Sequence, residues 1–116
     1  MSLSDLRRAE RATLAIEVRP SPHEVVVDVR GELDLSTVPT LRAVLDGVDP
    51  RHHRIVLDLG KVTFLDSMGV GLLVEAARRC ESELCELVLR SPSERVRQVL
   101  QLTGLHEMLP VIDRDR

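Results

Sequence analysis

The residues best suited to chemistry stand in one short stretch, Asp66-Ser67-Met68-Gly69, which places a carboxylate, a hydroxyl and a glycine together. An apolar run at residues 55–59 precedes this stretch, and apolar residues at helical spacing follow it. The stretch is therefore predicted to be a strand-to-helix junction. Such a junction exposes unpaired backbone N–H groups and the positive end of the helix dipole, and both favour a carboxylate or a phosphate.

Each side chain of this stretch has a structural role to weigh against a functional one. Asp66 either caps the helix or contacts a partner, and Ser67 is either a first-turn hydroxyl or a phosphate acceptor. Met68 is either a packing residue or a flexible apolar contact for a partner. Gly69 and Gly71 are predicted to allow close packing, because a phosphate-binding loop would need a glycine run with a lysine.

Two further acids, Glu32 and Asp34, follow a β-branched run at residues 25–29. Ligands of α/β sheets tend to bind at the carboxyl ends of the strands. If the two junctions are adjacent, these acids and Asp66 form an acidic rim that faces a basic partner. The alternative reading is a pair of solvated loop acids.

The composition indicates one globular domain and excludes several classes of partner. The chain has 116 residues, 43% of them hydrophobic, and Phe64 is its only aromatic residue. The core must therefore be aliphatic, and no aromatic platform for stacking nucleic-acid bases is expected. The net charge is -3 and the arginines are scattered, so no polyanion-binding stripe is expected either. No apolar run suits a membrane span or a signal peptide, which predicts a cytoplasmic protein without a membrane partner.

The sequence offers no pattern typical of a metal site or of a catalytic group. Cys80 and Cys85 lack metal-ligand spacing and are expected to be free thiols. No nucleophile with a nearby base is identifiable, so no catalytic residue, metal or cofactor is predicted. The histidines are scattered along the chain as His23, His52, His53 and His106.

The hydrophobic patterns predict an α/β fold in the order β-β-α-β-α-β-α-β, with a mixed central sheet, an opening hairpin and helices packed on it. Residues 1–12 are predicted to be a flexible or weakly helical arm, residues 13–112 the domain, and residues 113–116 a solvated tail. Gly31 is expected to end the second strand and to begin a loop. The strands are expected at residues 13–18, 25–29, 55–59, 84–89 and 108–112, and the helices at residues 38–48, from 67, and from 92.

Capping residues mark the predicted helix ends. Ser36 or Thr37 is expected to cap the first helix. Ser91 is expected to cap the third helix, with Glu94 reaching back to it in a capping box. Gly104 suits a helix stop, and Pro110 restricts the last strand to a sheet edge.

Over roughly residues 12–112 the chain resembles the STAS domain, and more closely the bacterial anti-sigma factor antagonists. The specific matches are Gly-Glu-Leu-Asp at residues 31–34 and Leu-Asp-Ser-Met-Gly at residues 65–69. Supporting matches are Arg-Ser-Pro-Ser at residues 90–93 and Leu-Thr-Gly-Leu at residues 102–105. The resemblance implies a non-enzymatic STAS domain, monomeric or weakly dimeric, whose partner is an anti-sigma factor of the histidine-kinase-type ATPase fold.

The resemblance also implies a partner-switching function. Antagonists of this family sequester an anti-sigma factor that is also a serine kinase, and so free a sigma factor. The kinase phosphorylates the hydroxyl residue just before the motif glycine, and the antagonist then dissociates. Asp66, Ser67 and Gly69 match the family motif, but Met68 occupies the acceptor position and cannot take a phosphate.

We therefore hypothesise that the protein binds its partner through Glu32, Asp34 and residues 66–69 without release by the usual phosphorylation. Ser67 is the substitute acceptor, if there is one. Two alternatives stay open. In the first alternative, the chain is a STAS interaction module of a stressosome-like or lipid-transport assembly. In the second, it is a small nucleotide-binding or enzymatic α/β protein. The absence of a phosphate-binding loop and of a catalytic grouping argues against the last of these.

Overall fold

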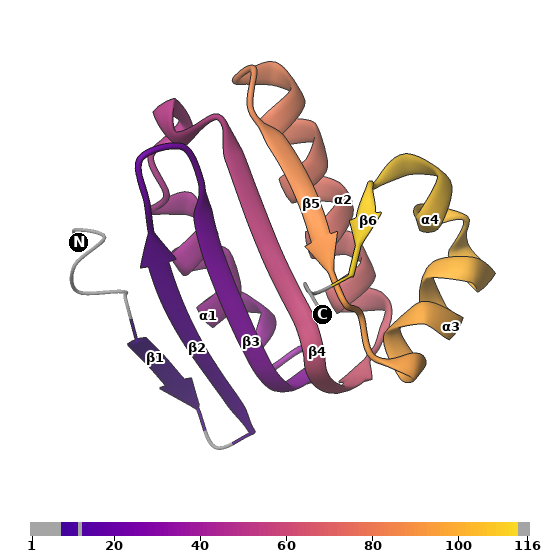
Figure 1. Cartoon of the computed structure of the whole chain (residues 1–116). Coiled ribbons are helices and arrows are strands. Elements are labelled where there is room, and N and C mark those ends of the chain that lie inside the picture. Colours follow the sequence, from indigo (N-terminus) through magenta and orange to yellow (C-terminus); the bar gives the residue numbers. More distant parts are fainter. Residues whose placement is uncertain (1–7, 12, 114–116) are drawn as a thin grey trace.

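The computed structural model describes residues 8–11 and 13–113, which build one mixed sheet with helices packed on it (Figure 1). The sheet has six strands in the order β1-β2-β3-β4-β5-β6. The pairs β1–β2 and β2–β3 are antiparallel, and the pairs from β3 to β6 are parallel. The strands are β1 (Arg8–Arg11), β2 (Leu14–Pro20), β3 (Val25–Leu33), β4 (Arg54–Leu65), β5 (Glu86–Arg90) and β6 (Val111–Ile112).

The helices connect the parallel strands. The parallel strands follow one another across the sheet in sequence order. Right-handed connections between strands in this order place all their helices on the same face of the sheet. Accordingly, α1 and α2 both lie behind the sheet in Figure 1, and α3 and α4 follow beside β5 and β6. The helices are α1 (Val38–Asp46), α2 (Ser67–Ser82), α3 (Glu94–Thr103) and α4 (Leu105–Met108), with a short 3₁₀ turn, η2 (Pro50–His52).

The core lies between this sheet face and the helices, and it is aliphatic, as the composition predicts. Leu14, Ile16 and Val18 alternate along β2 with less buried residues, which is the pattern of a strand covered on one face. The single aromatic residue, Phe64, is only partly buried. The predicted α/β class, the mixed sheet and the opening hairpin are therefore confirmed.

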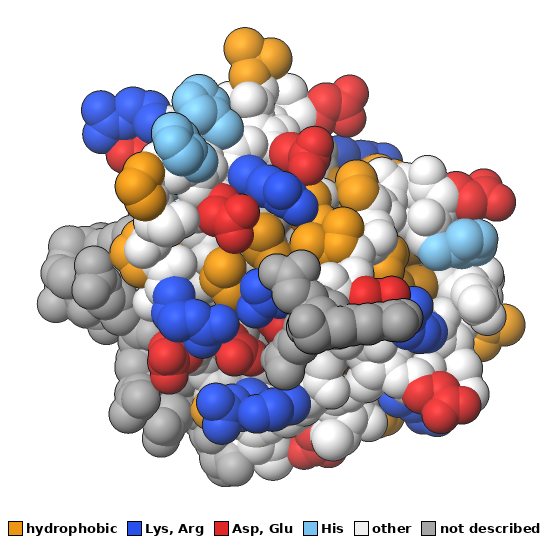
Figure 2. All heavy atoms as spheres, viewed as in Figure 1, with side chains coloured by type: hydrophobic (Ala, Val, Ile, Leu, Met, Phe, Trp, Pro, Cys, Tyr) orange, Lys and Arg blue, Asp and Glu red, His pale blue; other side chains and the backbone are white. Residues whose placement is uncertain are grey.

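The opposite face of the sheet carries charged side chains (Figure 2). The predicted apolar strand at residues 55–59 is indeed buried throughout, but it contains Asp58, which is 0% exposed. The Asp58 carboxylate pairs with the Arg90 guanidinium of β5 at 2.8 Å. Arg54 and Arg90 also line a hollow over the buried side chain of Val56. Long basic side chains therefore lie over β4 on the face opposite the helices.

Gly31 does not end β3, so the prediction of a strand break there was wrong. The strand continues to Leu33, with shifts of register against β4 on both sides of Gly31. The residue has φ +110°, and a Cβ atom there would collide with the carbonyl oxygen of Thr13. Glycine therefore permits an irregular strand here rather than a loop.

The prediction of a flexible or weakly helical arm was wrong for Arg8–Arg11, which form β1. This segment pairs antiparallel with β2, which would otherwise be an open edge of the sheet. The remaining residues of the arm, 1–7 and 12, lie outside the described residues, as do residues 114–116 of the predicted tail. Asp113 is described and pairs with Arg97 at 2.9 Å.

The start of α3 also differs from the prediction. Ser93, and not Ser91, is the N-cap, and its hydroxyl accepts from the Val96 N–H at 3.3 Å. Ser91 has φ +45°, which breaks the capping box because the chain turns there before the helix begins. Gly104 ends α3 in the left-handed conformation, as predicted, and the short helix α4 that follows was not predicted.

Strand β5 begins at Glu86, two residues later than predicted. Leu84 is exposed and has φ +58°, so it belongs to the turn after α2. The strand was predicted too long because Leu84, although it lies in the turn, is apolar and continues the apolar run of the strand. The last strand, β6, is shorter than predicted but lies at the sheet edge, as Pro110 indicated.

Candidate functional site

The two junctions identified in the sequence lie side by side at the carboxyl ends of β3 and β4. These strands run parallel, with Glu32 opposite Phe64 and Leu33 opposite Leu65. The Asp66 N–H donates to the Leu33 carbonyl at 3.2 Å, which joins the β3–α1 loop to the β4–α2 junction. The two junctions are therefore adjacent, which is the condition that the predicted acidic rim requires.

Asp66 caps α2. Its backbone is extended, and its Oδ1 accepts from the N–H groups of Met68 at 2.9 Å and Gly69 at 3.3 Å. The carboxylate thus satisfies two of the four N–H groups that a helix start leaves unpaired, and its charge complements the dipole of α2. The structural reading of Asp66 is confirmed, and the side chain remains partly exposed.

Replacing Asp66 with alanine is expected to lower the free energy of unfolding by about 0.5–2 kcal/mol, because the first turn of α2 loses its cap. The matched control is Ser67→Ala, which changes an exposed neighbour in the same turn and is expected to stay within about 0.5 kcal/mol of wild type. Urea denaturation of the three proteins checks this. Equal losses in the two variants would contradict the capping role.

Ser67 and Met68 occupy the first turn of α2 and face outward. Ser67 is the first residue of the helix and is exposed. The Met68 side chain is 40% exposed, so Met68 is not a core residue. Leu35, in the adjoining β3–α1 loop, is 71% exposed and was not identified from the sequence. The one sequence feature that could have indicated an exposed contact residue is an apolar side chain between Asp34 and Ser36 in a polar loop.

Gly69 allows α2 to pack closely on the ends of β3 and β4. A Cβ atom at this position would collide with Leu65 Cδ1 and would lie 3.2 Å from Leu33 Cβ and 3.3 Å from the Leu33 carbonyl oxygen. The packing role predicted for Gly69 is therefore confirmed. The same prediction was wrong for Gly71, which is exposed and where a Cβ atom would meet nothing within 4 Å, because it lies on the outer side of the helix.

Asp34 organises the loop that leads into α1. Its Oδ1 accepts from the Ser36 hydroxyl at 2.8 Å and from the N–H groups of Ser36 at 2.9 Å and Thr37 at 3.1 Å. The Ser36 hydroxyl bond is the first cause that lowers the pKa of Asp34 below its ordinary value. The loop is therefore stabilised above the ordinary carboxyl pKa and loses this stabilisation as the pH falls through the lowered pKa.

Thr37 stands at the N-cap position of α1, but its hydroxyl does not cap the helix. The hydroxyl instead donates to the Glu32 carbonyl at 2.7 Å and accepts from the Asp34 N–H at 2.9 Å. Neither Ser36 nor Thr37 is thus the side-chain cap that was predicted. The prediction failed because Asp34, three residues earlier, supplies the oxygen that the loop N–H groups need.

Glu32, Asp34 and Asp66 are partly exposed, and none of them forms an ion pair within residues 13–113. Their carboxylates therefore give one edge of the domain a negative potential. Leu35, in the β3–α1 loop, and Met68, in the first turn of α2, add exposed apolar side chains to this edge. We call these five residues the acidic edge.

The described part of the chain contains no group of three or more His, Cys, Asp or Glu side chains that could hold a metal ion. Among the helices of residues 13–113, none is long and apolar enough to cross a membrane. The acidic edge has acids, a capped helix start and exposed apolar side chains. These features suit recognition of another protein.

The fold and the site are those of a STAS domain. The family model described as "Mlab, STAS domain" matches residues 16–110, which is most of the chain. The anti-sigma-B factor antagonist of Staphylococcus aureus is 33% identical over 99 residues, which cover 84% of this chain and 92% of the relative.

Solved structures agree with this class. The anti-sigma factor antagonist SpoIIAA in its unphosphorylated form superposes with a TM-score of 0.72 at 27% identity, covering 87% of this chain and 89% of that one. An anti-sigma factor antagonist from Mycobacterium paratuberculosis has a TM-score of 0.69 at 29% identity, covering 90% and 89%. This chain therefore belongs to the anti-sigma factor antagonist family of STAS domains, whose members are non-enzymatic regulatory proteins.

Proposed function

We propose that this protein binds a cytoplasmic anti-sigma factor of the histidine-kinase-type ATPase fold through the acidic edge, and so frees a sigma factor. Its relatives are named as antagonists of anti-sigma factors, which supports a partner of this class. The observation that carries the site assignment is the exposed first turn of α2, with Met68 40% exposed beside Glu32, Asp34 and Asp66. A basic patch on the partner would complement these acids.

Met68 is central to the proposed regulation. A phosphate at this position would add about −1.5 to −2 charges beside the Asp66 carboxylate, and burying such charge in an interface is costly. Met68 offers no hydroxyl and instead presents a flexible thioether to the partner. We propose that the complex therefore persists where a family member with a hydroxyl here would be phosphorylated and released.

Ser67 is the remaining hydroxyl of this turn, one position earlier on α2. Successive helix residues are rotated by about 100° around the axis, since a turn holds 3.6 residues. A kinase that aligns its ATP with the side chain of residue 68 would therefore find the Ser67 hydroxyl pointing in a different direction. We propose that this kinase does not phosphorylate Ser67.

Mixing the protein with Mg-ATP and each anti-sigma kinase of the same genome tests the proposal. Wild-type protein is expected to co-elute with one kinase and to gain no phosphate by intact mass. The Met68→Ser variant is expected to gain one phosphate and to lose co-elution, because the acceptor hydroxyl is restored beside Asp66. Ser67→Ala in both backgrounds is the control that assigns any phosphate to a residue.

Two results would contradict the proposal in different ways. A stoichiometric phosphate on wild type that disappears in Ser67→Ala would show that the switch survives on a shifted acceptor. Failure of wild type to bind any of these kinases would remove the proposed partner. If a large defined assembly then appeared on size-exclusion chromatography, the chain would be a STAS interaction module of a different complex.

A further inference from the structure

The turn that ends α2 brings two cysteines together. The Cys85 N–H donates to the Cys80 carbonyl at 2.9 Å, and Leu84 between them has φ +58°. A hydrogen bond across five residues that encloses a left-handed residue is the signature of a Schellman motif. In that motif the side chains at the two ends of the hydrogen bond typically touch. Here both of those side chains are cysteines.

The two thiols are close and differ in exposure. Burial, followed by a hydrogen bond with the Cys85 thiol, raises the pKa of Cys80 to about 12. Cys80 is buried, whereas Cys85 is partly exposed. Both belong to helix and turn segments whose backbone is held in place by the motif. The pair therefore combines a reachable thiol with a buried thiol already beside it.

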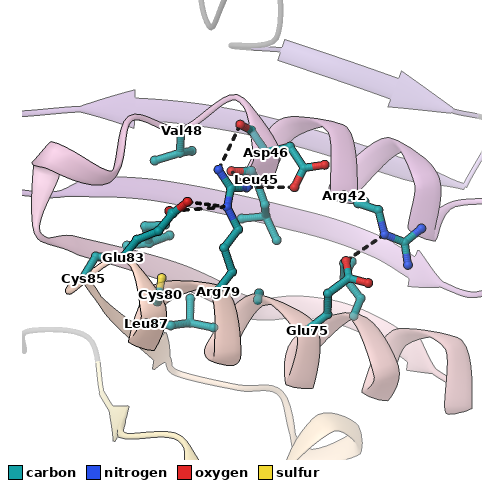
Figure 3. Close-up of a pocket in the computed structure, with 13 residues that line it drawn as sticks. Arg42, Leu45, Asp46, Val48, Glu75, Arg79, Cys80, Glu83, Cys85 and Leu87 are labelled. Atoms are coloured by element: carbon teal, nitrogen blue, oxygen red, sulfur yellow. Dashed lines mark hydrogen bonds and ion pairs between the residues drawn. The ribbon is translucent and has the colours of Figure 1, made fainter.

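Two hollows give small molecules access to this pair. Figure 3 shows the first, a hollow between α1, α2 and the sheet with Cys80 and Cys85 at one end. The Arg42–Glu75 and Arg79–Asp46 ion pairs, each at 2.8 Å, bridge α1 and α2 along it. Both cysteines also line a second hollow, beside the segment from Met108 to Pro110.

We propose that Cys80 and Cys85 are a redox modification site, which a peroxide converts to a reversible intrachain disulfide. The Cys85 thiolate attacks one peroxide oxygen, the O–O bond breaks, and water leaves after protonation, which gives a sulfenic acid at Cys85. The Cys80 sulfur then attacks the Cys85 sulfur. An S–S bond forms, the S–O bond breaks, and the hydroxyl leaves as water with the Cys80 proton.

This assignment of roles follows from the geometry. The oxidant reaches Cys85 first because Cys85 is the more exposed thiol, and Cys80 resolves it because the Schellman turn holds it alongside. The high pKa of Cys80 makes it a slow resolving thiol, since little thiolate is present near neutral pH. The second step is therefore expected to accelerate as the pH rises above neutral, with the charged neighbours Glu83 and Arg79 shifting the pKa of this thiol in opposite directions.

The test uses the full chain, exposed to hydrogen peroxide and examined by intact mass without reductant. Wild type is expected to lose two hydrogen atoms with no oxygen added to either cysteine, to become unreactive to a thiol reagent, and to recover both thiols with dithiothreitol. Cleavage after Glu81 or Glu83 without reductant is expected to leave the Cys80 and Cys85 peptides joined, because both acids lie between the two cysteines. The Cys80→Ser variant is expected to accumulate oxygen on Cys85 because its resolving thiol is absent.

The Cys85→Ser variant keeps the test decisive if the buried substitution at Cys80 prevents folding. This change at the partly exposed position is expected to leave Cys80 reduced and to abolish the loss of hydrogen. The proposal is overturned if wild type accumulates oxygen on Cys85 while Cys80 remains open to alkylation. It is also overturned if the only disulfides formed link two chains.

Discussion

Replacing Arg90 with methionine is expected to lower the free energy of unfolding by about 3–5 kcal/mol, because it removes one partner of a buried ion pair. The Arg90 Nε lies 2.8 Å from Asp58 Oδ2, and the Asp58 side chain is 0% exposed. Asp58 also stands directly opposite Asp28 of β3, which is itself buried. Without Arg90, the negative charges of these two neighbouring acids at the centre of the sheet would be balanced by one positive charge fewer.

A surface pair of the same geometry provides the matched control. The Arg42 Nε lies 2.8 Å from Glu75 Oε2, but these side chains are 38% and 54% exposed. Water screens such a pair, so Arg42→Met is expected to cost at most about 1 kcal/mol. Equal losses in the two variants, measured by urea denaturation, would show that burial of Asp58 does not determine the effect.

A double variant separates the charge from the packing of Arg90. Asp58→Asn removes the charge but keeps an oxygen that can accept from the Gly60 N–H, a bond of 2.9 Å in the wild type. Asp58→Asn combined with Arg90→Met is therefore expected to be more stable than Arg90→Met alone, because the double variant no longer buries the Asp58 charge. The same stability in the single and the double variant would assign the loss to packing.

The parts of the fold that could be predicted from the sequence are those with a strong local signal. The β-branched run at residues 25–29, the apolar run at residues 55–59 and the helical spacing after residue 66 predicted the order of elements from β2 onward, except for η2 and α4. Gly104 after α3 was interpreted correctly because it has a backbone preference that no neighbour opposes. The capping role of Asp66 at the start of α2 could likewise be predicted, because it depends only on the residues that follow it.

The parts that could not be predicted depend on neighbours distant in sequence. β1 exists because β2 offers an open edge, and nothing in the segment from Arg8 to Arg11 alone requires a strand. Asp58 appears as an interruption of an apolar run until Arg90, 32 residues away, is placed beside it. Gly31 resembles a strand break because the carbonyl of Thr13, which it accommodates, lies far away in the sequence, in the turn before β2.

The candidate site shows the same division. The motif placed Asp66, Ser67, Met68 and Gly69 at a junction, and parallel pairing of β3 with β4 then brings Asp34 next to them. The exposure of Leu35 and the capping of the loop N–H groups by Asp34 depend on the path of the loop. Sequence patterns do not determine that path, since several polar side chains there can accept the same hydrogen bonds.

Replacing Gly69 with alanine is expected to lower the free energy of unfolding by about 1–3 kcal/mol and to weaken partner binding, because the new methyl group pushes α2 away from β3. The Cβ atom would collide with Leu65 Cδ1, and Leu65 is itself buried. It would also crowd the Leu33 carbonyl, which accepts the Asp66 N–H at 3.2 Å. The substitution thus strains the contact that joins the two loops of the acidic edge.

Gly71 supplies the internal control for this prediction. It lies in the same helix, and a Cβ atom there meets nothing within 4 Å, so Gly71→Ala is expected to raise stability by about 0.5–1 kcal/mol through the better helix propensity of alanine. Both variants gain that propensity, so the difference between them isolates the collision at residue 69. Urea denaturation and partner titration of the pair measure it. A stabilised Gly69→Ala variant would show that Leu65 can move aside, and that α2 is not held at this distance by the glycine.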